Sequence, residues 1–218
     1  MQGILSQFTD RVDPAHTAIV VVDMQNDFCA AGGHIDRRFG CDQAANEALA
    51  DRIAALVAAG RSRGAHMVWV QAIYDDKYVP PPMLAKSAER GDTGPRCAEG
   101  SWGADFYRLA PADGDILIRK HCYSAFQGTP LDAQLRRRGV RTLVVTGVST
   151  NICVESTFRD GHSRGYYIVV PGDCVASPAP DLHAATLRNV ETLIGDVTAA
   201  EDLIALWTAA AGDLKTAV

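Results

Sequence analysis

The apolar positions along the chain follow two alternating periodicities. Continuous apolar runs of strand length, such as residues 18–22 (Ala-Ile-Val-Val-Val), are typical of strands buried on both faces of a sheet. Other segments, such as 42–64, place apolar residues at helical spacing and end in glycine. We expect strands at 18–22, 66–73, 115–120, 142–148, 166–170 and 196–197, and helices at 42–64, 129–139, 151–163, 181–194 and from 198 to about 207.

Two of these helices begin with recognisable capping sequences. Thr129-Pro130-Leu131-Asp132 combines an N-cap hydroxyl, a proline at the first helical position and an acidic residue in the first turn. Thr198, followed three residues later by Glu201, has the spacing of a capping box.

Six repeats of strand and helix predict an α/β fold, a doubly wound parallel sheet of six strands with helices on both faces. The length of the chain suits one domain over residues 1–218, since α/β domains reach ~250 residues. Residues 74–111 interrupt the repeat with three consecutive prolines, several glycines and no sustained period. Because long irregular segments inside a domain are often functional, we expect a loop with some short helix that covers a site.

The composition excludes several classes of protein. Hydrophobic residues make up 47% of the 218 positions, enough for a sizeable core, and the net charge of −5 disfavours nucleic acid or an anionic membrane as partner. No apolar run approaches the ~18–20 residues of a membrane span, and the first 15 residues lack the order of a secretion signal. Six cysteines without a C-x-x-C pair indicate reduced thiols. We therefore expect a cytoplasmic protein.

Three reactive residues are expected at the carboxyl ends of strands, where open parallel sheets bind their ligands. Asp23 ends the first strand, Lys120 ends the third, and Cys153 lies just past the fourth, in the first turn of its helix. The helix dipole and the Lys120 ammonium favour a thiolate at Cys153, while Asp23 can accept and return a proton. The turn at 147–151 offers backbone N–H groups for an oxyanion hole.

Each of the three residues also has a purely structural interpretation. Cys153 could fill a small volume in the core, Asp23 could cap the Gln25–Asn26 turn, and Lys120 could carry a strand-end charge out to water. The occurrence of all three at neighbouring strand ends favours a shared catalytic site.

Three segments resemble the isochorismatase-like cysteine hydrolases, and the resemblance extends in order from Thr17 to about Trp207. They are Val-Asp-Met-Gln-Asn-Asp-Phe at 22–28, Lys-x-x-Tyr-Ser-Ala-Phe at 120–126, and Thr-Gly-Val-Ser-Thr-Asn-Ile-Cys-Val-Glu-Ser-Thr at 146–157. The resemblance implies the Rossmann-like sheet of that family and a homo-oligomer, a dimer or a tetramer.

The resemblance also implies roles for individual residues. It assigns a catalytic triad to Asp23, Lys120 and Cys153, and a non-proline cis peptide to the Val148–Ser149 bond. The backbone N–H groups of Ser149 and Cys153 would then form the oxyanion hole. Because family members with isochorismatase activity lack the cysteine, its presence here indicates hydrolysis of amide C–N bonds.

A metal site is not expected. Nicotinamidase-like members bind a metal through an Asp-x-His-x-x-His cluster after the second strand. Here that region reads Tyr-Asp-Asp-Lys-Tyr at 74–78, and no histidine lies between His66 and His121. We therefore expect no metal ion and no other cofactor, with Asp75 and Asp76 as solvated loop charges.

The segments 123–132, 154–161 and 189–192 resemble the branch that hydrolyses ureidoacrylate, biuret and N-carbamoyl compounds. We expect a metal-independent cysteine amidohydrolase that cleaves a small ureido- or carbamoyl-type amide through a thioester acyl-enzyme and releases ammonia or an amine. One alternative is a maleamate-like monoamide hydrolase, whose substrate carboxylate would need Arg96 or Lys77. The other is a binding or scaffold protein of the same fold without catalysis.

The residues of the substrate pocket are the least determined part of the prediction. Core packing is the alternative for the aromatic candidates, and capping of the nucleophile helix is the alternative for the asparagine. His162 and His183 are expected in helices away from the strand ends, in structural or surface roles. The candidates are Phe28, Tyr123, Phe126, Gln127 and Asn151.

Overall fold

A parallel sheet forms the centre of the computed structural model, which describes residues 3–92 and 94–215, with side chains described up to residue 209. The strand order is β3-β2-β1-β4-β5-β7, and β6 pairs with the end of β4. Within the described residues the strands are β1 (Thr17–Val22), β2 (His66–Ala72), β3 (Ile116–Lys120), β4 (Thr142–Val148), β5 (Tyr167–Pro171), β6 (Val175–Ala176) and β7 (Asp196–Thr198).

The sheet has seven strands where the sequence predicted six. The additional strand, β6, contains two residues that pair with Gly147 and Val148 of β4. A two-residue strand is too short for a hydrophobic period, so only the tertiary structure reveals it. The doubly wound parallel arrangement itself is confirmed.

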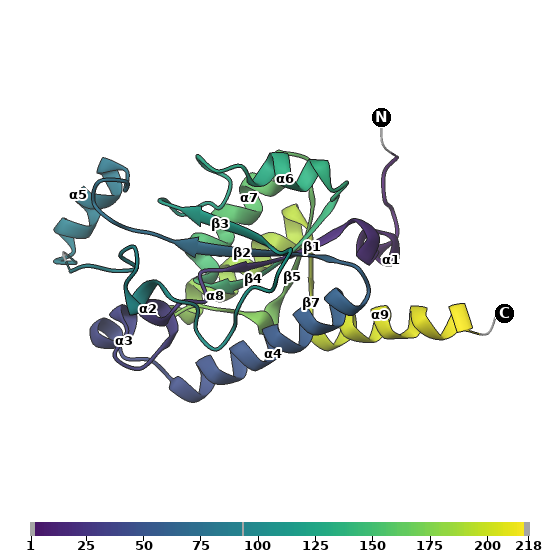
Figure 1. Ribbon diagram of the computed structural model, residues 1–218, viewed down its shortest axis with the longest axis horizontal. Coiled ribbons are helices and arrows are strands. Elements are labelled where there is room, and N and C mark those ends of the chain that lie inside the picture. Colours follow the sequence, from purple (N-terminus) through teal and green to yellow (C-terminus); the bar gives the residue numbers. More distant parts are fainter. Residues whose placement is uncertain (1–2, 93, 216–218) are drawn as a thin grey trace.

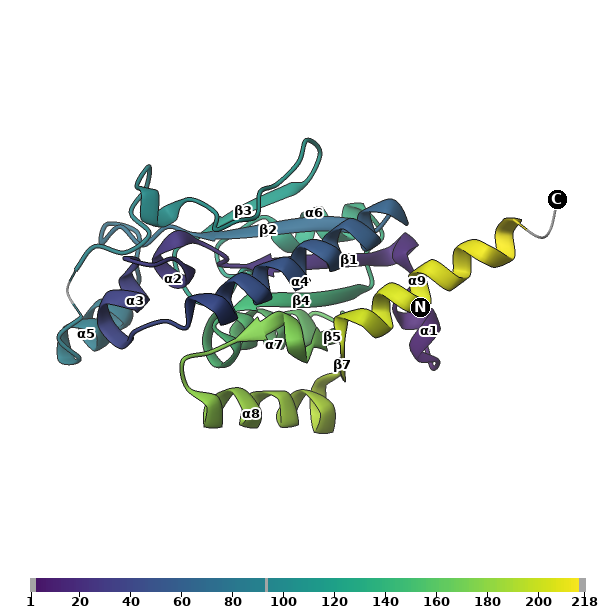
Figure 2. The ribbon, with the colours of Figure 1, turned by 90° about the horizontal axis from the view of Figure 1, so that it is seen from below.

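Helices cover both faces of the sheet (Figure 1), with α4 and α9 on one face and α6 and α7 on the other. The described α-helices are α1 (Phe8–Arg11), α2 (Asn26–Cys29), α3 (His34–Phe39), α4 (Gln43–Ser62), α5 (Pro81–Glu89), α6 (Leu131–Arg137), α7 (Glu155–Ser163), α8 (Pro180–Asn189) and α9 (Ala200–Lys215). Helix α9 continues beyond the expected end near Trp207 and projects past the sheet (Figure 2). No helix in the described part of the chain is long and apolar enough to cross a lipid bilayer.

The strands are buried on both faces because their side chains alternate between two hydrophobic cores. In β1, Ile19 and Val21 enter the core beneath α4 and α9, whereas Ala18, Val20 and Val22 enter the core beneath α6 and α7. Because successive side chains of a strand point to opposite faces, a strand between two cores is apolar at every position. A continuous apolar run therefore correctly predicted a central strand.

The helix starts follow the predicted chemistry with small shifts. The hydroxyl of Thr129 accepts the backbone N–H of Leu131 at 3.3 Å, although α6 begins one residue later than expected. The capping residue at the start of α9 is Asp202, whose carboxylate accepts the Ala199 N–H at 3.4 Å, in place of the predicted Glu201.

The segment 74–111 contains the short helix that was expected, and buried polar side chains tie it to the sheet. Gln25, just after β1, donates to the carbonyls of Ala72 and Ala104 and accepts the N–H of Ala72 at 2.7 Å. The carboxylate of Asp27 accepts the N–H of Cys97 at 2.6 Å. These bonds hold the segment over the carboxyl ends of β1 and β2.

The alternating burial of β3 can be tested with two neighbouring residues. Ile118 is 1% exposed and Leu117 is 44% exposed. We expect Ile118→Ala to lower the free energy of unfolding by about 2–5 kcal/mol, because it leaves a cavity in the core. Leu117→Ala, the matched control, should change it by about 0.5 kcal/mol or less. Urea denaturation measures both, and equal losses would show that the two faces of β3 are assigned wrongly.

Candidate active site

The structure brings Asp23 and Lys120 together at the carboxyl edge of the sheet. Asp23 directly follows β1, with a φ of 52° that is uncommon for a residue other than glycine, and its N–H donates to the Val70 carbonyl at 3.0 Å. Lys120 is the last residue of β3. Its Nζ lies 2.8 Å from Oδ2 of Asp23, and both side chains are fully buried. The predicted meeting of these strand ends is therefore present.

The Lys120 ammonium has three polar neighbours. Besides Asp23, Nζ donates to the carbonyl oxygen of Cys122 at 3.0 Å and to the hydroxyl of Tyr74 at 3.2 Å. Burial alone would disfavour the charge, but Asp23 and the other neighbours outweigh it and raise the pKa of Lys120 well above its usual value. Lys120 is therefore a permanently charged buried group and does not extend to water.

Cys153 lies beside this pair, in η3 (Thr150–Val154), a π-helical turn that leads into α7. It is only 6% exposed. Burial raises the pKa of its thiol to about 12, an effect that the nearby Lys120 reduces and the charge of Asp23 reinforces. Burial therefore opposes the thiolate that the helix end and the lysine favour.

The carboxylate of Asp23 is the group suited to receive the thiol proton. Burial raises the pKa of Asp23 as well, more than Lys120 lowers it. Its Oδ1 is buried without a hydrogen-bond partner among residues 3–92 and 94–215. A thiol and a carboxylate of raised basicity can exchange a proton without water, as general base catalysis requires.

The turn that carries Cys153 is closely packed against neighbouring elements. The Val148–Ser149 peptide is cis, as the family resemblance implied. Gly147 has a φ of 104°, and a Cβ atom there would overlap the Val22 carbonyl oxygen, so only glycine fits between β4 and β1. The N–H groups of Ile152 and Val154 donate to the Ser149 carbonyl.

Side chains from α8 and from the segment before it brace the same turn. His183 bonds through Nδ1 to the Thr150 hydroxyl at 2.9 Å, so it lies nearer the strand ends than expected, although its role there is structural. Asn151 does not cap the helix, because its Oδ1 accepts the Ser177 hydroxyl at 2.7 Å. The first turn is π-helical, which changes the positions that a cap would have to satisfy.

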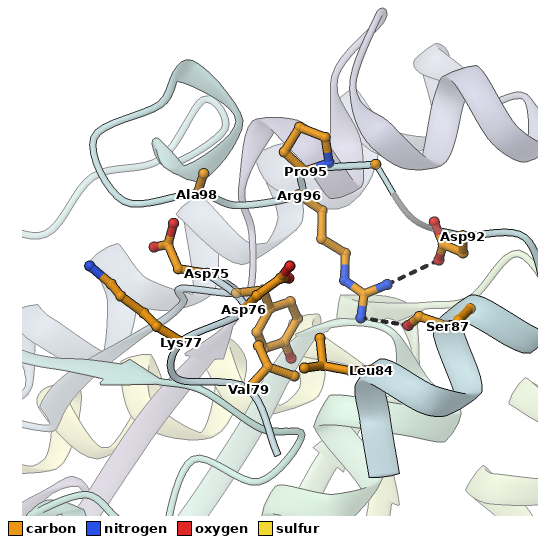
Figure 3. Close-up of a pocket in the computed structure, with 13 residues that line it drawn as sticks. Asp75, Asp76, Lys77, Val79, Leu84, Ser87, Asp92, Pro95, Arg96 and Ala98 are labelled. Carbon is orange, nitrogen blue, oxygen red and sulfur yellow. Dashed lines mark hydrogen bonds and ion pairs between the residues drawn. The ribbon is translucent and has the colours of Figure 1, made fainter. Parts of the chain in front are cut away.

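A cavity of about 630 Å³ lies within the irregular segment (Figure 3), and Tyr74, whose hydroxyl accepts from Lys120, is part of its lining. Its lining comes from residues 74–77 and Val79, from α5, and from residues 92, 94–96 and 98, all within the irregular segment. Arg96 lies in it with its guanidinium 5.2 Å from the centre of the Tyr74 ring, and donates to Asp92 at 3.0 Å and Ser87 at 3.2 Å. Lys77 and Arg96, the suggested carboxylate anchors, both line this cavity.

The five predicted pocket residues have different surroundings in the structure. Phe126 is buried in the core beneath α6 and α7, where its ring stacks on Tyr166 at 6.0 Å, which supports the core-packing alternative. Phe28 and Tyr123 are half-buried against the small apolar cluster beneath the irregular segment, and Gln127 is exposed. None of the five, Asn151 included, lines the cavity.

Tyr74 is the site residue that the sequence did not identify. Its hydroxyl accepts from Lys120 and lies 3.8 Å from Sγ of Cys153, 79 residues away in the chain. No spacing rule links a tyrosine at the end of the second strand to a cysteine after the fourth. The parallel order of the strands alone places them together.

The irregular segment also contains residues 74–78, which we compared with the metal-binding region of nicotinamidase-like proteins. Among the described residues, no group of three or more His, Cys, Asp or Glu side chains is arranged so that it could hold a metal ion. Asp75 accepts the Glu99 N–H at 3.0 Å, while Asp76 lines the cavity.

Comparison with known proteins agrees with this geometry. The model of the isochorismatase domain matches residues 17–202. A ureidoacrylate amidohydrolase from Methylobacterium radiotolerans is 40% identical over 210 residues, covering 88% of this chain and 81% of the relative. A cysteine hydrolase from Pseudomonas syringae has a TM-score of 0.82 at 26% identity, covering 96% of this chain and all of that one. For N-carbamoylsarcosine amidase from Thermoplasma acidophilum the TM-score is 0.68 at 27% identity, covering 84% and 96%.

The parallel α/β sheet and the thiol beside a buried carboxylate and ammonium define a cysteine hydrolase as the class of protein. The chain belongs to the isochorismatase family and is a hydrolase of that family.

The buried pair makes a testable contribution to stability. We expect Lys120→Met to lower the free energy of unfolding by about 3–5 kcal/mol, because it leaves a buried carboxylate without a counter-charge. Adding Asp23→Asn should recover part of the loss. Lys86→Met, which removes the 65%-exposed partner of Glu89, is the control and should cost no more than about 1 kcal/mol. Denaturation of the three variants measures this, and equal losses at positions 86 and 120 would contradict the interpretation.

Proposed function

We propose that the protein is a metal-independent cysteine amidohydrolase that cleaves the C–N bond of a small ureido- or carbamoyl-type amide. The observation that carries the proposal is the buried Asp23–Lys120 pair beside Cys153, at the point where the strand order reverses between β1 and β4. The amidohydrolase relative at 40% identity and the N-carbamoylsarcosine amidase fold neighbour support the substrate class.

The first half of the reaction forms a thioester. Sγ of Cys153 attacks the carbonyl carbon while its proton passes to Oδ1 of Asp23. The backbone N–H groups of Ser149 and Cys153 hold the oxyanion, and Lys120 supplies positive charge. As the intermediate collapses, the C–N bond breaks and the nitrogen takes the proton from Asp23, so that ammonia or an amine leaves.

The second half restores the enzyme. Water attacks the thioester carbon and gives a proton to Asp23, the C–S bond breaks, and the sulfur recovers the proton from Asp23. The cavity of about 630 Å³ beside Tyr74 is the space in which we place the substrate. Its size falls within the ~300–1,000 Å³ that small-molecule sites occupy.

Removal of the sulfur tests the nucleophile. We expect Cys153→Ala to abolish hydrolysis of a panel of ureido, carbamoyl and simple amides, measured as ammonia release, because no thioester can form. Cys174→Ala, which removes a buried cysteine outside the site, is the matched control and should keep activity. Trapping of an acyl adduct on the peptide that contains Cys153 should accompany turnover. Full activity of Cys153→Ala would refute the proposal.

The same panel separates the proposed substrate class from a dicarboxylic monoamide such as maleamate. The carboxylates of Asp75 and Asp76 line the cavity, and Arg96 is already paired with Asp92. The lining therefore offers Lys77 as a cation for a substrate carboxylate. Faster hydrolysis of maleamate than of ureido compounds would favour the monoamide alternative.

The pKa of Asp23 predicts the acid limb of the pH profile. Only the ionised carboxylate can take the thiol proton, and burial raises the pKa of Asp23. As the pH falls, kcat/KM should therefore begin to decrease at a pH above the ~3.9 of an ordinary aspartate. Steady-state rates between about pH 4 and pH 9 measure this limb. An acid limb that lies near pH 4 would contradict the role of Asp23.

A further inference from the structure

Tyr74 connects the cavity to the buried pair. One face of its ring lies under the Arg96 guanidinium, 5.2 Å from the ring centre, and forms part of the cavity lining. Its hydroxyl, at the edge of the ring, lies 3.2 Å from Nζ of Lys120 and 3.8 Å from Sγ of Cys153. The residue as a whole is buried.

The direction of the hydrogen bonds follows from a count of protons. The Lys120 ammonium donates to the Cys122 carbonyl and to the Tyr74 hydroxyl, and it forms an ion pair with Asp23. The Tyr74 oxygen is therefore an acceptor from the lysine, and its own proton must go to another acceptor. Within reach are the Cys122 carbonyl at 3.3 Å, which already accepts from Lys120, and Sγ of Cys153.

We propose that Tyr74 is a further positioning residue of the reaction, whose hydroxyl donates a hydrogen bond to the Cys153 thiolate as Asp23 takes the thiol proton. The proposal rests on the proposed function, because it requires Cys153 to be the nucleophile. The proton balance is unchanged, since the thiol proton moves to Asp23 and Tyr74 keeps its own. The donor is polarised because its oxygen accepts from a charged lysine, and such linked hydrogen bonds strengthen one another.

A phenylalanine would fill the same volume and present the same ring to Arg96, so packing alone does not require the hydroxyl. A buried hydroxyl is costly unless its hydrogen bonds are satisfied. Burial also raises the pKa of Tyr74 well above its usual value, so the group remains a donor throughout the working pH range. These features agree with a functional role for the hydroxyl.

The test compares Tyr74→Phe with Tyr78→Phe in the full chain. Tyr78 belongs to the same segment but is exposed, and it does not line the cavity. We expect Tyr74→Phe to lower kcat about tenfold with less than a twofold change in KM, because the ring remains and the charge-assisted bond is lost. The rate at which iodoacetamide labels Cys153, followed on its own peptide by mass spectrometry, should also fall about tenfold, with its pH midpoint moved upward. Tyr78→Phe should change none of these.

A second variant covers the case in which Tyr74→Phe does not fold. Replacing Tyr74 by 3-fluorotyrosine keeps the shape of the side chain and makes the hydroxyl a stronger donor, so the labelling midpoint should move to lower pH. Unchanged labelling and kcat in both folded variants would overturn the role of Tyr74. This outcome is distinguishable from failure of the proposed function, which full activity of Cys153→Ala would show, because labelling reports on the thiol without turnover.

Discussion

The ion pair between Asp23 and Lys120 is the constraint on which the site depends. Two opposite charges are fully buried 2.8 Å apart, at the ends of strands that flank β2 on either side. Removal of such charges from water costs several kcal/mol per ion, and only close pairing with additional hydrogen bonds offsets it. The pair therefore exists only where the strand ends hold both groups in register. The sheet provides this register, since Ala72 of β2 pairs with Lys120 and Val22 pairs with Val70.

The irregular segment between β2 and β3 encloses this charged centre. Gln25 and Asp27 follow β1 directly, and their side chains are buried in hydrogen bonds to the backbone of Ala72, Ala104 and Cys97. A chain without regular structure can be held in place when polar side chains satisfy its backbone groups. Tyr74, which lines the cavity and contacts Lys120, connects the two.

Burial changes the chemistry of the thiol from that expected of an exposed cysteine at a helix end. The helix dipole and Lys120 both favour the thiolate, yet removal of the sulfur from water has the larger effect and raises the pKa of Cys153 to about 12. The same burial raises the pKa of Asp23. Burial therefore favours a proton on the sulfur, next to the carboxylate that we propose as its acceptor. This arrangement suits proton transfer during attack.

The sequence by itself determined the alternation of strands and helices, the parallel α/β class and the three strand-end residues Asp23, Lys120 and Cys153. These features depend on periodicity and on local order along the chain, which a linear pattern preserves. The sequence also carried the family motifs. The resemblance that they establish implied the cis peptide at Val148–Ser149, which the structure contains.

Only the tertiary structure decided the surroundings of those residues. Tyr74 joins the site because β2 lies between β1 and β3. Phe126 packs into the core beneath α6 and α7. The two-residue strand β6 forms only against the end of β4. Burial, and with it the protonation of Cys153 and Asp23, depends on which segments cover the strand ends. Contacts between residues far apart in the chain decide that coverage, and no local pattern of residue types encodes them.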